Sequence, residues 1–221
     1  MPLWFQFLRW VHILCGMLAF FVAPVAMATL KGGPVHRKAG KIYFWMMAVV
    51  GMTAILMAVY LPILFLALVA VFSFYFAFRG YRVLQRKHGP ALALDWIGAL
   101  VTLAGSMGLI MLGALHPGGV AMAAPIVSIA FGGLGVSIAG IDVYRFLRPS
   151  HDKNAWWYSH MGGMLGSYIA AVSAFSAVNF HFLPPVIRWL WPAAIGVPAI
   201  FIWIGYYRRK FGQRRTAAVP G

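Results

Sequence analysis

Seven long apolar segments, separated by short polar ones, make up most of this 221-residue chain. Their lengths are close to the roughly 20 residues that an α-helix needs to cross a bilayer. Proline and glycine mark several connections, such as Pro62 and Pro184-Pro185, because these residues end helices and start tight turns. Transmembrane β-strands would instead alternate apolar and polar residues in segments of about ten. The pattern predicts helices over residues 3–30, 41–60, 62–79, 91–115, 120–146, 156–179 and 185–207.

The predicted fold is therefore all-α, a polytopic membrane protein with seven transmembrane helices in a single domain over residues 1–207, followed by a basic cytoplasmic tail over residues 208–221. Composition agrees, because 62% of the residues are hydrophobic and 10% are charged, whereas a soluble domain carries about 25% charged residues. The first apolar segment continues to Leu30 without a small-residue cleavage site, so we expect it to remain as a helix. The single cysteine, Cys15, excludes a disulfide framework and a thiolate metal cluster.

The formal net charge of +15 falls almost entirely on one side of the predicted bundle. Of the 18 lysines and arginines, only Arg9 and Arg188 lie on the other side. Short loops rich in Lys and Arg face the cytoplasm, so we expect the N-terminus outside and the C-terminus in the cytoplasm. The topology and contact with anionic lipid head groups explain this charge, so we expect no nucleic-acid partner. The bilayer and its head groups are the expected partners, and a homo-oligomer or a membrane partner stays open.

Ionisable residues inside a bilayer are costly and are the first candidates for a function. One layer of such residues lies toward the predicted outer side of the bilayer and contains His12, His116 and His181. Two of these histidines at similar depth on facing helices would suit a b-type haem, which takes axial imidazoles, or a metal ion. The alternative is that they are interfacial or helix-packing residues.

An inner layer, nearer the basic side, contains four further candidates: His36, Asp95, Asp142 and His160. Imidazole and carboxylate together suit a divalent metal such as zinc, and the histidines also suit proton transfer. The simpler interpretation is that each aspartate neutralises a loop arginine, or that Asp95 caps a helix N-terminus. Small residues at intervals of four on the predicted helices 91–115 and 156–179 indicate interior faces, which would bring Asp95 near His160.

The segment HRKAGKIYF, which opens the second helix, combines basic residues with a histidine, a glycine and a tyrosine. In a helix that starts near His36, residues 36, 40 and 43 share one side. We therefore expect His36 and Tyr43 to face the bundle across a close approach at Gly40, while Arg37 points toward head groups or solvent.

Several stretches resemble one known group of proteins: His12 followed by Gly16, the element HRKAGKIYFW, Asp95-Trp96, the segment HMGGMLGSYIAAVSAFSAVN, and the closing WPAAIGVPAI. They are similar to the bacterial membrane-protein family catalogued as domain of unknown function 2306. The resemblance implies a seven-helix protein of the bacterial inner membrane. It also implies recurrent residues, namely His12, His36, Arg37, Gly40, Tyr43 and His160, but no established reaction.

Three functions remain open from the sequence, and whether the protein is an enzyme is among the open questions. The first is a redox protein with a histidine-ligated haem or metal. The second is a zinc-dependent intramembrane hydrolase or lipid-modifying enzyme, and the third is a transporter or assembly factor that uses protonatable His and Asp. The membrane part of the seventh helix has no lysine for a retinal Schiff base, and P-loop and dinucleotide-binding glycine motifs are missing.

Overall fold

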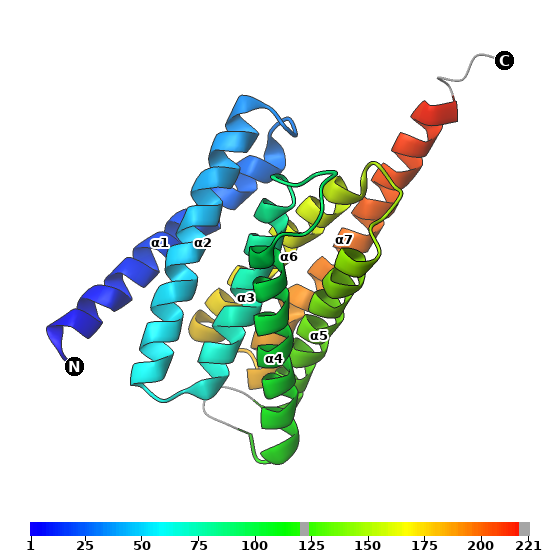
Figure 1. Ribbon diagram of the computed structural model, residues 1–221. Helices are drawn as coiled ribbons and strands as arrows, with labels where there is room; N and C mark the ends of the chain where they lie inside the picture. Colours follow the sequence, from blue (N-terminus) through cyan, green and yellow to red (C-terminus); the bar gives the residue numbers. More distant parts are fainter. Residues whose placement is uncertain (120–123, 217–221) are drawn as a thin grey trace.

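The computed structural model describes the backbone of residues 1–119 and 124–216 and the side chains through Phe211. All regular secondary structure in these ranges is helical (Figure 1). The helices are α1 (Leu3–Ala28), α2 (Pro34–Tyr60), α3 (Leu64–Arg82), α4 (Ala93–Leu115), α5 (Pro125–Leu147), α6 (Ala155–Asn179) and α7 (Pro185–Thr216). Each contains a stretch long and apolar enough to cross a membrane. The predicted all-α architecture with seven candidate membrane spans is thus confirmed.

Two observed helix ends differ most from the predicted ones. Helix α2 begins at Pro34, not at residue 41, because Pro34 occupies the first helical turn and the basic segment after it is helical although it is not apolar. Helix α7 continues to Thr216, past residue 207, so the first part of the predicted tail belongs to this helix. Residues 120–123, predicted as the start of the fifth helix, and 217–221, at the end of the tail, lie outside the described residues.

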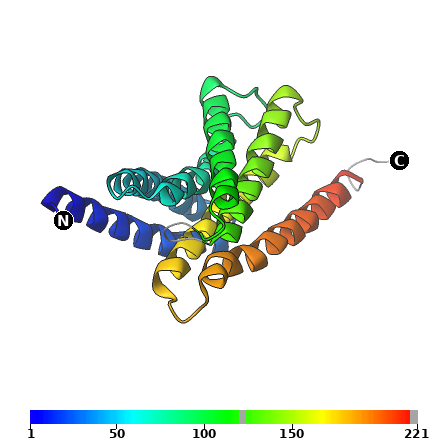
Figure 2. The same ribbon diagram turned by 90° about the horizontal axis from the view of Figure 1, so that it is seen from below.

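Helices α3 and α6 form the centre of the bundle. Helix α3 packs against α2, α4 and α6, and α6 packs against α3, α7 and part of α1. The pairs α1–α2 and α4–α5 flank this centre, and α1 and α7 diverge to opposite sides of the molecule when it is viewed from below (Figure 2). In the described part of the chain α4 does not contact α6, because α3 lies between them. Direct packing of α4 on α6 therefore does not bring Asp95 to His160.

The crossing of α3 and α6 depends on two glycines. A Cβ atom on Gly163 would lie 2.7 Å from the Cα atom of Gly80 and 2.8 Å from the carbonyl oxygen of Phe76. The two backbones therefore touch, which is the contact that small residues allow between membrane helices. The small-residue interval in the sequence correctly indicated a packed face on α6, but its partner is α3.

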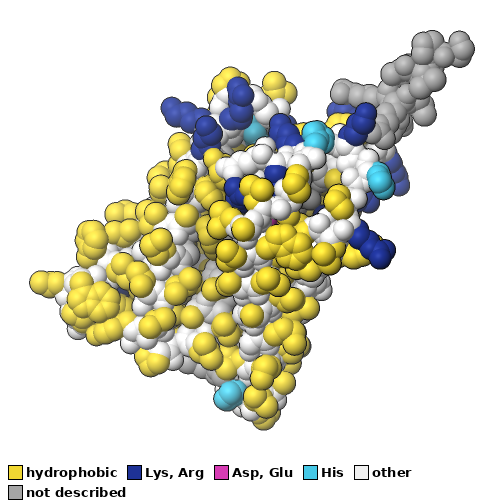
Figure 3. Space-filling model, in the orientation of Figure 1, with side chains coloured by type: hydrophobic (Ala, Val, Ile, Leu, Met, Phe, Trp, Pro, Cys, Tyr) yellow, Lys and Arg dark blue, Asp and Glu magenta, His cyan; other side chains and the backbone are white. Residues whose placement is uncertain are grey.

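Lysine and arginine side chains gather at one end of the bundle, which we call the basic end (Figure 3). This end carries the α1–α2, α3–α4 and α5–α6 connections and the last turns of α7. Most of the opposite part of the surface in Figure 3 is hydrophobic, as the surface of a helix in contact with lipid would be.

Candidate functional site

The carboxylate of Asp142 on α5 is held in a buried ion pair with Arg79 on α3. The guanidinium donates from Nε to Oδ2 at 2.5 Å and from Nη2 to Oδ1 at 2.6 Å. The Tyr75 hydroxyl donates a third hydrogen bond to Oδ2 at 2.8 Å. Both carboxylate oxygens are therefore engaged, and the interpretation that this aspartate neutralises an arginine is confirmed.

Asp95 is engaged in a similar way on α4. The guanidinium of Arg82 donates to its two oxygens at 3.1 and 3.2 Å, and Arg86 forms a second ion pair at 3.3 Å. Its Oδ2 also accepts the backbone amide hydrogen of Leu92 at 2.9 Å, which satisfies one free donor at the start of α4. Asp95 thus both neutralises arginines and caps its helix, as the simpler interpretation predicted.

The predicted metal site of His36, Asp95, Asp142 and His160 is therefore not assembled as one group. Over residues 1–119 and 124–211, no cluster of three or more His, Cys, Asp or Glu side chains could hold a metal ion. The physical reason is that the arginines on α3 and just after it bind the two carboxylates, while the two histidines lie elsewhere.

The three outer histidines do not come together either. His12 on α1 donates from Nδ1 to Thr53 Oγ on α2 at 2.9 Å, because the Thr53 hydroxyl itself donates to the Val49 carbonyl oxygen at 2.7 Å. His116 is exposed and donates to the Leu112 carbonyl oxygen of its own helix, and His181 is exposed and contacts Arg188. His116 lies at the end of α4, which α1 does not contact in the described ranges, and His181 lies in the connection between α6 and α7.

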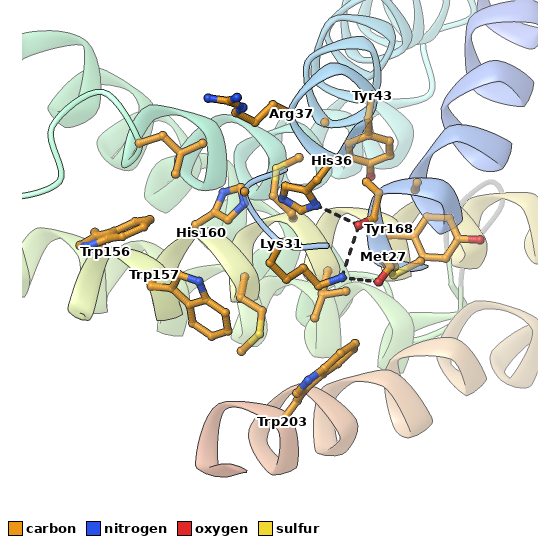
Figure 4. A pocket seen from close by; sticks show the side chains of 18 of the residues that line it. Met27, Lys31, His36, Arg37, Tyr43, Trp156, Trp157, His160, Tyr168 and Trp203 are labelled. Atoms are coloured by element: carbon orange, nitrogen blue, oxygen red, sulfur yellow. Dashed lines mark hydrogen bonds between the residues drawn. The ribbon is translucent and has the colours of Figure 1, made fainter. Parts of the chain in front are cut away.

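His36 and His160 are the two predicted site residues that the structure brings together. Their rings lie 6.2 Å apart between centroids and are inclined by 77° to each other. Both line a cavity of about 510 Å³ at the basic end, between α1, α2, α6 and α7, which we call the histidine cavity. Figure 4 shows the two rings beside each other, one from the start of α2 and the other from α6.

Each of these two histidines is anchored through the same ring nitrogen. His36 Nδ1 lies 2.9 Å from the Ala26 carbonyl oxygen, and His160 Nδ1 lies 2.8 Å from the Gly80 carbonyl oxygen. A carbonyl oxygen only accepts, so Nδ1 carries the hydrogen in both rings and Nε2 keeps its lone pair when the ring is neutral. This arrangement, with one nitrogen fixed by the backbone and the other available, is typical of histidines that ligate a metal.

The walls of the histidine cavity are mainly aromatic and sulfur-containing side chains. Trp156 and Trp157 lie one turn before His160 on α6, and Trp203 comes from α7 (Figure 4). The remaining large side chains of these walls include Met27, Tyr43, Met161, Met164 and Tyr168. The sequence interpretation missed the tryptophans, although the spacing of Trp156 and Trp157 from His160 placed all three on neighbouring positions of one helix. Trp203 is far away in the sequence and gave no such signal.

Three cations reach the same cavity. Lys31 donates to the carbonyl oxygens of Ala26, Met27 and Thr29, and so satisfies free acceptors at the end of α1. Burial lowers the pKa of the Lys31 ammonium below its usual value. The ammonium of Lys87 lies 4.5 Å from the ring centre of Trp156, and Arg37 is exposed at the rim, as predicted.

Gly40 has a different role from the predicted one. A Cβ atom at this position would meet no heavy atom within 4 Å, so no helix approaches closely here. Gly40 instead lines the histidine cavity, one turn after His36. The absence of a side chain therefore leaves room beside His36.

Tyr43 faces the bundle, as predicted, and links α2 to α6. Its ring is 2% exposed, and its hydroxyl donates to Ser167 Oγ at 2.8 Å. We expect Tyr43→Phe to destabilise the protein by about 1 kcal/mol, because Ser167 then loses its buried partner. Thermal unfolding in detergent should show a midpoint lower by roughly 2 to 4 °C. Tyr60→Phe, at a half-exposed ring, is the control, and an equal shift in both variants would contradict a stabilising role for this hydrogen bond.

Comparisons of the chain with protein-family models, with curated proteins and with solved structures gave no match. The family resemblance of the sequence motifs therefore stays an expectation.

Proposed function

We propose that the protein is a membrane-bound redox protein that holds a b-type haem between His36 and His160. The observation that carries this proposal is the pair of imidazoles from two different helices, each fixed through Nδ1 and facing one cavity. The ring centroids lie 6.2 Å apart, which would leave room for one metal ion to be held by both Nε2 atoms.

The walls of the cavity suit a haem better than a zinc ion. Zinc sites use three or four protein ligands, whereas the lining of the histidine cavity contains two histidines and no Asp, Glu or Cys. The broad apolar faces of Trp156, Trp157 and Trp203 suit a porphyrin, and the cationic rim with Arg37 and Lys87 suits its two propionates. The volume of about 510 Å³ is within the range of about 300 to 1,000 Å³ that small-molecule pockets occupy.

A bound haem supplies one-electron chemistry, and the protein sets its potential through the ligands, their hydrogen bonds and burial. Here the Ala26 and Gly80 carbonyls would make the imidazoles more basic ligands by accepting their Nδ1 hydrogens. The tryptophans would limit access of water from the side of α7. In this proposal His36 and His160 hold the haem, in place of the outer histidine pair that the sequence suggested.

The orientation and location of the protein belong to the same proposal. The positive-inside rule supports a cytoplasmic basic end, with the N-terminus outside and the C-terminus in the cytoplasm. The motif resemblance supports the bacterial inner membrane. The haem would then lie near the cytoplasmic surface, within reach of an electron-transfer partner that approaches from that side.

The zinc hydrolase and the proton-coupled transporter have less support. Both hypotheses used Asp95 or Asp142 together with the histidines, and both carboxylates are occupied by arginines. A site with two histidines and no carboxylate lacks the general base that the predicted aspartates would have supplied to activate water.

An optical spectrum of the intact protein tests the proposal. Protein purified in mild detergent from haem-replete cells is expected to be red, with a Soret band that shifts on dithionite reduction and about one iron per chain. His36→Ala and His160→Ala should each remove most of the haem or convert it to a five-coordinate form, because each deletes one axial ligand.

His181→Ala is the matched control, since it removes an exposed imidazole outside the cavity and should leave the spectrum unchanged. A colourless protein from the same cells would overturn the haem proposal. Zinc or copper bound in a one-to-one ratio and lost in His160→Ala would instead assign the histidine pair to that metal.

A further inference from the structure

A second cavity, of about 400 Å³, lies between α5 and α7 on the side of the bundle away from α1 and α2, and we call it the α5–α7 groove. Its lining comes from α5 and α7 and from α3 and α6 between them. The rings of Phe131 on α5 and Trp189 on α7, 5.9 Å apart, bring the two helices together at the end far from the basic end. Toward the basic end the groove lies between the two helices, and its lining is mainly apolar, with isoleucine, valine and leucine side chains and a few serines.

Besides Arg79, which is paired with Asp142, two arginines line the basic end of this groove. Arg145 comes from α5 and Arg208 from α7, and both side chains are exposed. Arg145 donates to Ser159 Oγ on α6 at 3.2 Å, and the Arg208 guanidinium lies 5.2 Å from the ring centre of Tyr158. Two guanidinium groups and a serine hydroxyl, from three helices, therefore lie together at the basic end of the groove.

Among the described side chains, neither of these two arginines lies within ion-pair distance of a carboxylate. The ion pairs in the described part of the chain are Arg79–Asp142, Arg82–Asp95 and Arg86–Asp95. Asp142, the acid nearest to Arg145 in the sequence, already binds Arg79 through both oxygens. The basic end of the groove therefore keeps an excess of positive charge that suits an anion.

We propose that the α5–α7 groove binds one anionic phospholipid from the leaflet at the basic end. Its phosphate contacts Arg145, Arg208 and Ser159, and an acyl chain follows the apolar lining toward Phe131. The distance along α5 from Arg145 to Phe131 is about 21 Å at 1.5 Å per residue, about half of a bilayer that measures roughly 40 to 45 Å with its head-group regions. The groove thus matches the depth of one leaflet.

The charge favours a lipid over a second copy of this chain. A second copy placed with its basic end on the same side would bring more lysines and arginines to Arg145 and Arg208, which is unfavourable. An anionic head group neutralises them, and juxtamembrane Lys and Arg attract such head groups. This proposal is independent of the haem proposal, because it uses other residues and another cavity.

Native mass spectrometry with defined lipids tests the proposal. The full-length protein is titrated with phosphatidylglycerol or with phosphatidylcholine of the same acyl chains, and it is expected to retain one phosphatidylglycerol at least fivefold more tightly. Arg145→Gln together with Arg208→Gln should weaken this binding roughly 10- to 30-fold, since each basic residue contributes about fivefold.

Arg148→Gln together with Arg209→Gln is the matched control. Arg148 directly follows α5 and Arg209 lies on α7, both are exposed at the same end, and neither lines the groove. Less than about a threefold loss is expected, because only general surface attraction is reduced. Ala193→Phe, which places a ring in the apolar part of the groove, should weaken the binding of phosphatidylglycerol as well.

Three results would overturn the proposal. The first is equal retention of the two lipids, or equal losses in the two double variants. The second is displacement by inorganic phosphate with no effect of Ala193→Phe, which would indicate a site for a free anion. The third is a dimer that Ala193→Phe dissociates without a lipid preference, which would assign the groove to a second copy of the chain.

Discussion

Asparagine in place of Asp142 is expected to destabilise the folded protein by about 3 to 5 kcal/mol, the cost of breaking a buried ion pair by removing one partner. The Arg79 side chain is only 13% exposed and would keep its charge without the carboxylate that now neutralises it. The Tyr75 hydroxyl would also lose a charged acceptor. The thermal unfolding midpoint in detergent should therefore fall by roughly 6 to 20 °C.

Asp152→Asn makes the same chemical change at an exposed position in the α5–α6 connection and serves as the control. Its midpoint should stay within about 2 °C of the unchanged protein, because surface charges contribute little. A double variant, Arg79→Met with Asp142→Leu, should recover most of the loss, since apolar residues can replace a buried pair. Equal midpoints for Asp142→Asn and Asp152→Asn would show that the ion pair does not stabilise the bundle.

Alanine in place of Gly163 is expected to destabilise the protein by about 1 to 3 kcal/mol through overpacking. The added Cβ atom would lie within 2.8 Å of three backbone atoms of Gly80 and Phe76, and backbone atoms cannot rotate away as a flexible side chain can. Helices α3 and α6 would have to separate at the centre of the bundle. We expect a midpoint lower by roughly 2 to 12 °C in the same thermal assay.

Gly162→Ala, one residue earlier on α6, is the matched control. Its Cβ atom would meet only the Ile204 Cδ1 atom, at an ordinary 3.9 Å. Alanine is a better helix former than glycine by up to about 1 kcal/mol, so this variant should be neutral or more stable. Because both variants gain the same helix propensity, the difference between their unfolding midpoints isolates the effect of the contact with α3. Indistinguishable midpoints would contradict the direct backbone contact.

The same crossing positions the histidine cavity. The Gly80 carbonyl oxygen accepts the Nδ1 hydrogen of His160, so the residue that α6 touches most closely also orients this ring. A shift between α3 and α6 therefore changes the distance between His160 and His36. Under the haem proposal, Gly163→Ala should reduce haem content as well as stability, whereas Gly162→Ala should reduce neither.

The sequence by itself determined the number of helices and the clustering of charge. Hydrophobicity is a local property, so the seven apolar segments marked seven helices, with the largest errors where helices extend beyond their apolar part, as at Pro34 and Thr216. The burial of Tyr43 and the exposure of Arg37 also followed from helical spacing. The simpler roles of the two aspartates were predicted because unpaired carboxylates near a bilayer are costly.

Only the tertiary structure decided which helices are neighbours, and with them the composition of the site. A membrane helix presents apolar side chains both to lipid and to other helices, so its pattern does not identify its partner. For this reason the sequence did not reveal that α3 separates α4 from α6, or that its arginines take up Asp95 and Asp142. The pairing of His36 with His160 among tryptophans from two helices depends on that same arrangement, because those side chains meet only when α2, α6 and α7 are packed.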